Sequence, residues 1–67
     1  MKLKLFRKNE IFSIILVAFV EINKERCLIR FVRDSTFPRE EIVFPLNLYK
    51  KILLDEEVIY EDEIENN

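Results

Sequence analysis

The first residues of the chain alternate between apolar and polar side chains. Leu3 and Leu5 would lie on one face of an extended chain, because successive side chains of a strand point to opposite faces. The other face would carry two lysines and an aromatic residue: Lys2, Lys4 and Phe6. The alternation predicts a strand over residues 2–7, and the polar residues 8–10 predict a turn after it.

The next two segments are richer in apolar residues and predict a β-hairpin. Residues 11–22 are β-branched, aromatic or aliphatic at nearly every position, which favours a strand buried on both faces and leaves a helix as the alternative. Residues 27–33 supply the returning strand. Any even-length turn places Cys27, Ile29 and Phe31 on the sheet face of Leu16, Ala18, Val20 and Ile22. We therefore expect Phe31 in the core.

The C-terminal half predicts a loop at 34–39, a strand at 41–44 and then a helix. Pro45 suits a first helical position, because its fixed φ is helical and its missing N–H is not needed there. Apolar residues follow at helical spacing, with Ile52 adjoining the stripe Leu46, Tyr49 and Leu53. This pattern predicts an amphipathic helix over residues 45–54 with Leu53 in the core and Asn47, Lys50 and Lys51 facing water.

The fold class predicted from these elements is α+β, a small and mainly antiparallel sheet with one amphipathic helix. Residues 58–60 suit a final short strand, and the acidic residues 62–67 are expected to fray. Residues 1–61 would then form a single domain, as expected for a chain of 67 residues.

The amino-acid composition excludes several common kinds of catalytic site. The chain has no His and no Gly, which excludes a His-based triad and glycine-rich phosphate loops. We expect no enzyme activity, no cofactor and no metal site, and we interpret the carboxylates at 40–41 and 55–57 as exposed charges. The lone Cys27 is expected to be a buried apolar residue of an intracellular, cytoplasmic protein. The apolar run 11–20 is too short for the roughly 20 residues that span a bilayer, so no membrane partner is expected.

Charge suggests two kinds of partner. Net charge is −2, which disfavours a general polyanion-binding role. Five residues near the N-terminus nevertheless resemble a nucleic-acid platform of cations with one aromatic residue: Lys2, Lys4, Phe6, Arg7 and Lys8. The same lysines are equally expected on an edge strand, where they prevent aggregation. The abundance of Ile, Lys and Glu fits a thermophile and an AT-rich genome equally well.

One stretch, residues 37–61, resembles the small β-rich domain of GINS-family DNA replication factors. The family pattern of an acidic-led strand ending in an apolar–Pro pair is similar to Glu41, Ile42, Val43, Phe44 and Pro45. Its inward helix positions correspond to Tyr49, Ile52 and Leu53, and its closing strand to Val58 and Ile59. Residues 27–35 are similar to its entering strand. Arg39 and Glu57 stand where the family commonly has glycines, and the large helical domain of a GINS subunit is absent.

The resemblance implies protein–protein contact within a replicative helicase assembly. We therefore predict a non-catalytic interaction module, which binds through exposed strand edges and the helix flank and is oriented by the charges of Arg39, Lys50 and Lys51. A small DNA-binding or virus- or plasmid-encoded regulatory protein that uses the basic N-terminal hairpin is the alternative. A homo-oligomer that buries surplus apolar surface between subunits is a third.

Overall fold

The fold of the chain is all-β. A computed structural model describes residues 1–34 and 39–62. Its elements are β1 (Lys2–Arg7), β2 (Phe12–Asn23), β3 (Leu28–Arg33), β4 (Glu41–Pro45), a 3₁₀ turn η1 (Leu46–Leu48), β5 (Tyr49–Leu54) and β6 (Glu57–Glu61). The strands predicted at 2–7, 41–44 and 58–60 are thus confirmed. The tail predicted at 62–67 lies outside the described residues except for Asp62, and so does the loop predicted at 34–39 except for Asp34 and Arg39.

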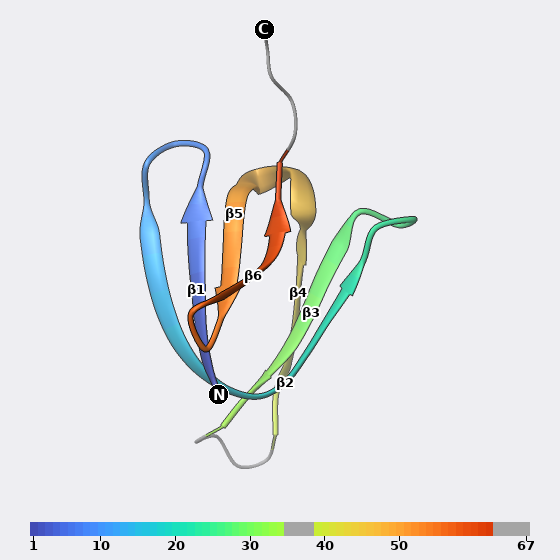
Figure 1. Cartoon of the computed structure of the whole chain (residues 1–67). Helices are drawn as coiled ribbons and strands as arrows, with labels where there is room; N and C mark the ends of the chain where they lie inside the picture. The colour runs from blue at the N-terminus through green and yellow to red at the C-terminus, as the bar shows by residue number, and fades with distance from the viewer. Residues whose placement is uncertain (35–38, 63–67) are drawn as a thin grey trace, which may run out of the picture.

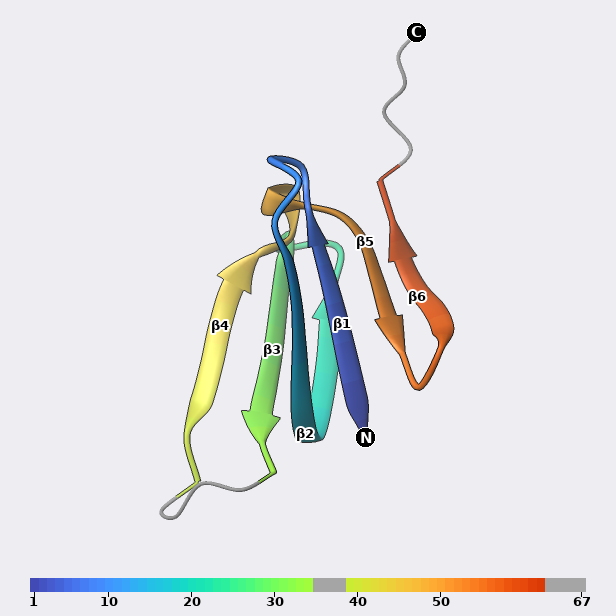
Figure 2. The ribbon, with the colours of Figure 1, turned by 90° about the vertical axis from the view of Figure 1, so that its left-hand side faces the viewer.

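The six strands form one antiparallel sheet in the order β4-β3-β2-β1-β5-β6. The long β2 belongs to two halves, because its first part pairs with β1 and its second part pairs with β3. The sheet bends along β2, so that β3 and β4 fold over towards β1 and β5 (Figures 1 and 2). The space between the halves holds the buried core of Leu3, Leu5, Val17, Ile29, Phe31, Leu46, Tyr49 and Ile52.

The hairpin of β2 and β3 is confirmed in its second part. Val20 pairs with Phe31, and Ile22 pairs with Ile29, as the even-length turn requires. Phe31 is fully buried, as predicted.

In its first part β2 differs from the prediction. Val17 pairs with Arg33 and Phe19 with Val32, which leaves Ala18 as an extra residue in a β-bulge. The bulge switches which alternate positions face the core, so that Leu16 does not share a face with Val20. Burial on both faces is also wrong, since Phe12, Ile14 and Leu16 are exposed by 48%, 54% and 60%.

The predicted helix at 45–54 is wrong, and with it the α+β fold class. Pro45 is the last residue of β4 with φ −68° and ψ 136°, an extended conformation. Only three residues then form a 3₁₀ turn before the chain continues as β5. Leu46, Tyr49 and Ile52 are buried at a spacing of three, whereas Leu53, predicted for the core, is only partly buried and lies on the outer face.

The turns place non-glycine residues in the left-handed region, because the sequence contains no glycine. Asp55 and Glu56 have φ values of 49° and 71° in the tight hairpin between β5 and β6. The Asp55 carboxylate accepts a hydrogen bond from the backbone N–H of Lys2 at 2.9 Å, which ties this hairpin to β1. Cys27, with φ 59°, is exposed in the turn before β3, so its predicted burial is wrong.

Candidate functional site

The outer face of β2, β1, β5 and β6 exposes a cluster of apolar side chains. Register places Ile14 opposite Lys4, Lys4 opposite Leu53 and Leu53 opposite Val58, so these four residues form one row across the strands. Phe12, Phe6, Lys51 and Glu61 form the neighbouring row. We call the apolar members of this face the outer patch, which consists of Phe6, Phe12, Ile14, Leu16, Leu53 and Val58.

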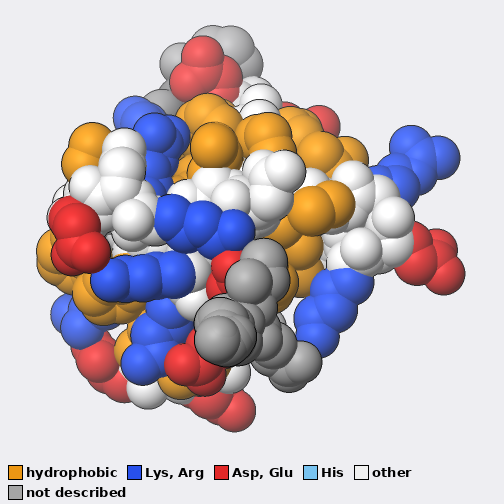
Figure 3. Space-filling view, turned by 90° about the horizontal axis from the view of Figure 1, so that it is seen from above, with side chains coloured by type: hydrophobic (Ala, Val, Ile, Leu, Met, Phe, Trp, Pro, Cys, Tyr) orange, Lys and Arg blue, Asp and Glu red, His pale blue; other side chains and the backbone are white. Residues whose placement is uncertain are grey.

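Two stacked aromatic rings form one end of the outer patch. The ring centroids of Phe6 and Phe12 are 4.6 Å apart, and the two ring planes differ by 28°. Beside Phe6 the surface is hollowed into an open depression of about 490 Å³, lined by Phe6, Lys50, Lys51, Leu53, Glu61 and Asp62. Figure 3 looks onto the end of the molecule at which β1 ends and shows hydrophobic side chains lying between basic ones.

The lysines of β1 are paired with carboxylates of the same chain. Lys4 Nζ lies 2.5 Å from Glu56 Oε2, and Lys2 Nζ lies 4.0 Å from the same oxygen. The hydrogen bond from Lys4, together with its charge, lowers the pKa of Glu56. The acidic turn after β5 therefore offsets the positive charge of β1.

The other basic candidates near the N-terminus are also engaged. Lys8 Nζ lies 2.7 Å from Asp62 Oδ2, and this hydrogen bond raises the pKa of Lys8. The guanidinium of Arg7 lies 5.7 Å from the centre of the Tyr49 ring, within the range of a cation–π contact. A phosphate group would have to compete with these internal partners for the basic side chains of β1.

The three residues predicted to orient a protein partner do not gather at one place. Lys50 is exposed in a bulge of β5, where its Nζ lies 3.7 Å from Glu10 Oε2. Lys51 is partly buried beside Phe6 on the outer face. Arg39 is exposed two residues before β4, in the other half of the sheet. The helix flank that would have presented Lys50 and Lys51 does not exist.

Sequence analysis missed most of the outer patch. Phe12, Ile14 and Leu16 were assigned to a strand buried on both faces, and Leu53 was assigned to the core. A signal was present in the pairing of β1 with β2, because Lys2 and Lys4 mark a solvent-facing side of β1. The residues of β2 opposite them, Leu16 and Ile14, must share that side.

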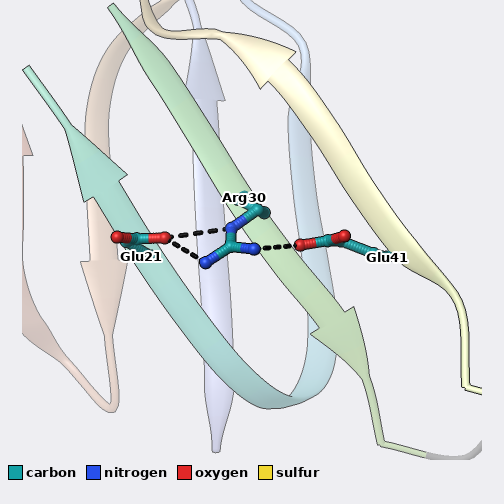
Figure 4. A network of polar contacts seen from close by, with 3 residues as sticks. All are labelled: Glu21, Arg30 and Glu41. Atoms are coloured by element: carbon teal, nitrogen blue, oxygen red, sulfur yellow. Dashed lines mark hydrogen bonds and ion pairs between the residues drawn. The ribbon is translucent and has the colours of Figure 1, made fainter. Parts of the chain in front are cut away.

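A cluster of charged side chains lies on the outer face of the other half of the sheet, formed by β2, β3 and β4 (Figure 4). Arg30 donates from Nε to Glu21 Oε1 at 2.9 Å and also pairs with Glu41, so that its side chain links β2, β3 and β4. The hydrogen bond to Glu21, followed in size of effect by that to Glu41, raises the pKa of Arg30. Its guanidinium also lies 5.5 Å from the Phe19 ring centre. Because each charge has a partner across the strands, the cluster stabilises the sheet.

The acidic side chains of the described residues are not grouped as metal ligands would be. Within residues 1–34 and 39–62, no three His, Cys, Asp or Glu side chains are grouped so that they could hold a metal ion. The same two segments contain no helix long and apolar enough to cross a membrane. What the outer patch offers chemically is apolar contact area and two stacked aromatic rings, with Lys4 and Lys51 lying among the apolar side chains.

Comparison with known proteins gives no family for this chain. It matches no protein-family model, and no curated protein or solved structure is significantly similar to it.

Proposed function

We propose that this domain is a non-catalytic protein-interaction module whose binding surface is the outer patch. The observation that carries the proposal is the gathering of large apolar side chains on one sheet face, with Ile14, Leu16 and Val58 about half exposed or more. A contiguous exposed apolar surface on a small domain is typical of a protein interaction site. Each of these side chains contributes binding free energy only when a partner removes it from water.

The ion pairs of β1 favour a protein over a nucleic acid as the partner. Affinity for nucleic acid comes largely from neutralising phosphates with lysine and arginine. Here Lys2 and Lys4 contact Glu56, and Lys8 contacts Asp62, so phosphate binding would have to break these contacts. A protein surface can cover the apolar side chains of the outer patch while Lys4 and Lys8 keep their carboxylate partners.

Components of a replicative helicase assembly are the first partners to test, because the resemblance to GINS small domains implies them. The proposal for the outer patch does not depend on that resemblance. The amphipathic helix that the family pattern expects at residues 45–54 is here a 3₁₀ turn followed by β5. We also propose that the domain acts inside the cell, in the cytoplasm.

Single-stranded nucleic acid is the second candidate, and one observation favours it. Phe6 is stacked on Phe12 and pairs in register with Lys51, which places a cation beside an aromatic surface. Bases stack on such aromatic side chains while cations follow the backbone.

The test captures partners on the immobilised chain from a nuclease-treated lysate of the source cells and then uses purified components. Each captured protein is purified and titrated against the chain at about 150 mM salt, where surface charges are screened beyond roughly 8 Å. Single- and double-stranded DNA are titrated in parallel. We expect saturable binding of a protein that persists when the salt concentration is raised.

Submicromolar DNA binding with a steep salt dependence would contradict the proposal, provided that replacing Lys2, Lys4, Arg7 and Lys8 with Ala abolishes it. That result would establish the nucleic-acid alternative instead.

A further inference from the structure

Two lysines and an aromatic ring follow one another on the outer face of β1. Lys2, Lys4 and Phe6 are alternate residues of this strand, so their side chains share a face at intervals of about 7 Å. Phe6 is stacked on Phe12, and Lys51 lies opposite Phe6 on β5. Cations beside stacked aromatic rings are the arrangement by which many proteins bind single-stranded nucleic acid. The outer face of β1 therefore carries the elements of such a surface.

A carboxylate of the same chain contacts both lysines of this row. Glu56 Oε2 lies 2.5 Å from Lys4 Nζ and 4.0 Å from Lys2 Nζ. One carboxylate oxygen is thus shared by two ammonium groups, as a phosphate oxygen would be. The Glu56 side chain is 62% exposed, and those of Lys2 and Lys4 are 48% and 20% exposed. The three charges therefore lie at the surface, where they act on an approaching partner.

The fold fixes Glu56 at this place through its neighbour Asp55. The Asp55 carboxylate accepts a hydrogen bond from Lys2 N at 2.9 Å, and Asp55 N donates to Lys2 O at 2.9 Å. The tight turn between β5 and β6 is thereby held against the first residue of β1. Glu57, the next residue, belongs to β6 and makes no ion pair in the two described segments. Of two adjacent glutamates, one contacts the lysines and the other does not.

We propose that Glu56 is the residue that determines which class of partner the outer face binds. By neutralising Lys2 and Lys4 it excludes nucleic acid and leaves the apolar side chains of the outer patch to a protein. This inference rests on the proposed function, because it explains how a face with both apolar and basic residues selects a protein. Without the Glu56 carboxylate, phosphate oxygens would contact the two lysines while a base stacks at Phe6.

Glu56 fits this role better than the other internal partners of the basic residues. Asp62 contacts Lys8, and the ring of Tyr49 contacts Arg7. Lys8 lies beyond the end of β1, and Arg7 contacts a ring that is buried on the core side of the sheet. Neither cation belongs to the row formed by Lys2, Lys4 and Phe6. Glu56 is the carboxylate that contacts this row.

Nucleic-acid binding by Glu56→Gln and Glu57→Gln tests the inference. Both variants raise the net charge of −2 by one unit at adjacent positions, but only the first releases the lysines. Each full chain is titrated into a fluorescently labelled oligothymidylate of about 15 nucleotides, and fluorescence anisotropy is measured at about 50 mM salt. We expect Glu56→Gln to bind at least about tenfold more tightly than the unmodified chain, and Glu57→Gln to stay within about twofold of it.

Salt dependence and a rescue experiment provide further readouts. Each phosphate contact on a single strand adds about 0.7 to the slope of log K against log salt concentration, so releasing Lys2 and Lys4 should steepen it by roughly 1.4. Adding Lys2→Ala and Lys4→Ala to Glu56→Gln should restore the affinity and slope of the unmodified chain. Glu56→Asn, whose side chain suits a left-handed turn, should behave like Glu56→Gln. Circular dichroism confirms that each variant retains the sheet.

Equal gains in affinity for Glu56→Gln and Glu57→Gln would overturn the inference, because net charge alone would then set the affinity. No gain for either Glu56 variant would overturn it as well, since Glu56 would not be the residue that excludes nucleic acid. Both results leave protein docking on the outer patch intact, because that docking is tested separately at Val58. Submicromolar binding with a steep salt dependence by the unmodified chain would contradict the inference and the proposed function together.

Discussion

Tyr49 and Ile52 lie three positions apart in β5, and both are buried in the core. In a regular strand they would point to opposite faces. The pairing of β5 with β1 explains the difference, because Arg7 pairs with Tyr49 and Phe6 with Lys51, leaving Lys50 as an extra residue. Leu46, at the start of the 3₁₀ turn, is buried as well. The buried residues are therefore three positions apart, at 46, 49 and 52, which resembles the apolar stripe of an amphipathic helix.

Because β5 is a strand, alanine substitutions at two adjacent positions should lower the free energy of unfolding by different amounts. Ile52→Ala should cost about 2–5 kcal/mol, because it leaves a cavity in the core. Leu53→Ala should cost roughly half as much or less, since its side chain is on the outer face. Urea unfolding monitored by circular dichroism measures both, with Phe31→Ala as a core reference of about 3–5 kcal/mol. Equal losses for Ile52→Ala and Leu53→Ala would argue for a helical stripe.

Deleting Lys50 tests the bulge directly. Without this residue, Tyr49 and Ile52 would be two positions apart and would share a face in a regular strand, so the shortened chain should still fold. Deletion of Lys4 is the matched control, because β1 has no extra residue there and the deletion puts Leu3 and Leu5 on opposite faces. We expect a cooperative thermal transition for the first deletion and loss of it for the second. The reverse order would refute the bulge.

The ion pair between Lys4 and Glu56 predicts a pH-dependent contribution to stability. The pKa of Glu56 is lowered from 4.5 in the folded state. The folded chain therefore binds this proton less readily than the unfolded chain, so the contribution is fully present above pH 4.5 and is lost as pH falls through the lower folded-state pKa.

Glu56→Gln should accordingly lower the Tm relative to the unmodified chain at about pH 7 and leave it unchanged at about pH 2. Glu57→Gln makes the same change in net charge and serves as the control. A Tm difference for Glu56→Gln that is as large in acid as at neutral pH would show that the side chain acts through packing and not through its charge.

Most strands could be predicted from the sequence, because their alternation and turn residues are local. The bulge in β2, which changes the set of alternate residues that faces the core, could not be predicted. Ala18 becomes an extra residue only because its neighbours Val17 and Phe19 pair with adjacent residues of β3. The 3₁₀ turn and β5 were predicted as a helix because their departure from strand periodicity also depends on pairing with a distant strand. Pro45 fits the end of an edge strand as well as the start of a helix, and the bulge at Lys50 depends on pairing with β1.

The candidate site was predictable only in part. Phe6 and Lys51 were identified, but on different predicted surfaces, and only the pairing of β1 with β5 brings them together. The ion pairs that offset Lys2, Lys4 and Lys8 involve Glu56 and Asp62, more than 50 positions away along the chain. The charge of the basic strand could therefore not be judged from neighbouring residues.

The most direct test of the outer patch as a protein-binding surface is the affinity of a purified captured partner for two matched variants. Val58→Ser and Val43→Ser change side chains of nearly equal exposure, 46% and 48%, on the two halves of the sheet. By isothermal titration calorimetry, we predict that Val58→Ser weakens binding at least about tenfold, or roughly 1.4 kcal/mol, and that Val43→Ser leaves it unchanged. Unchanged affinity for Val58→Ser together with weaker binding for Val43→Ser would contradict the account.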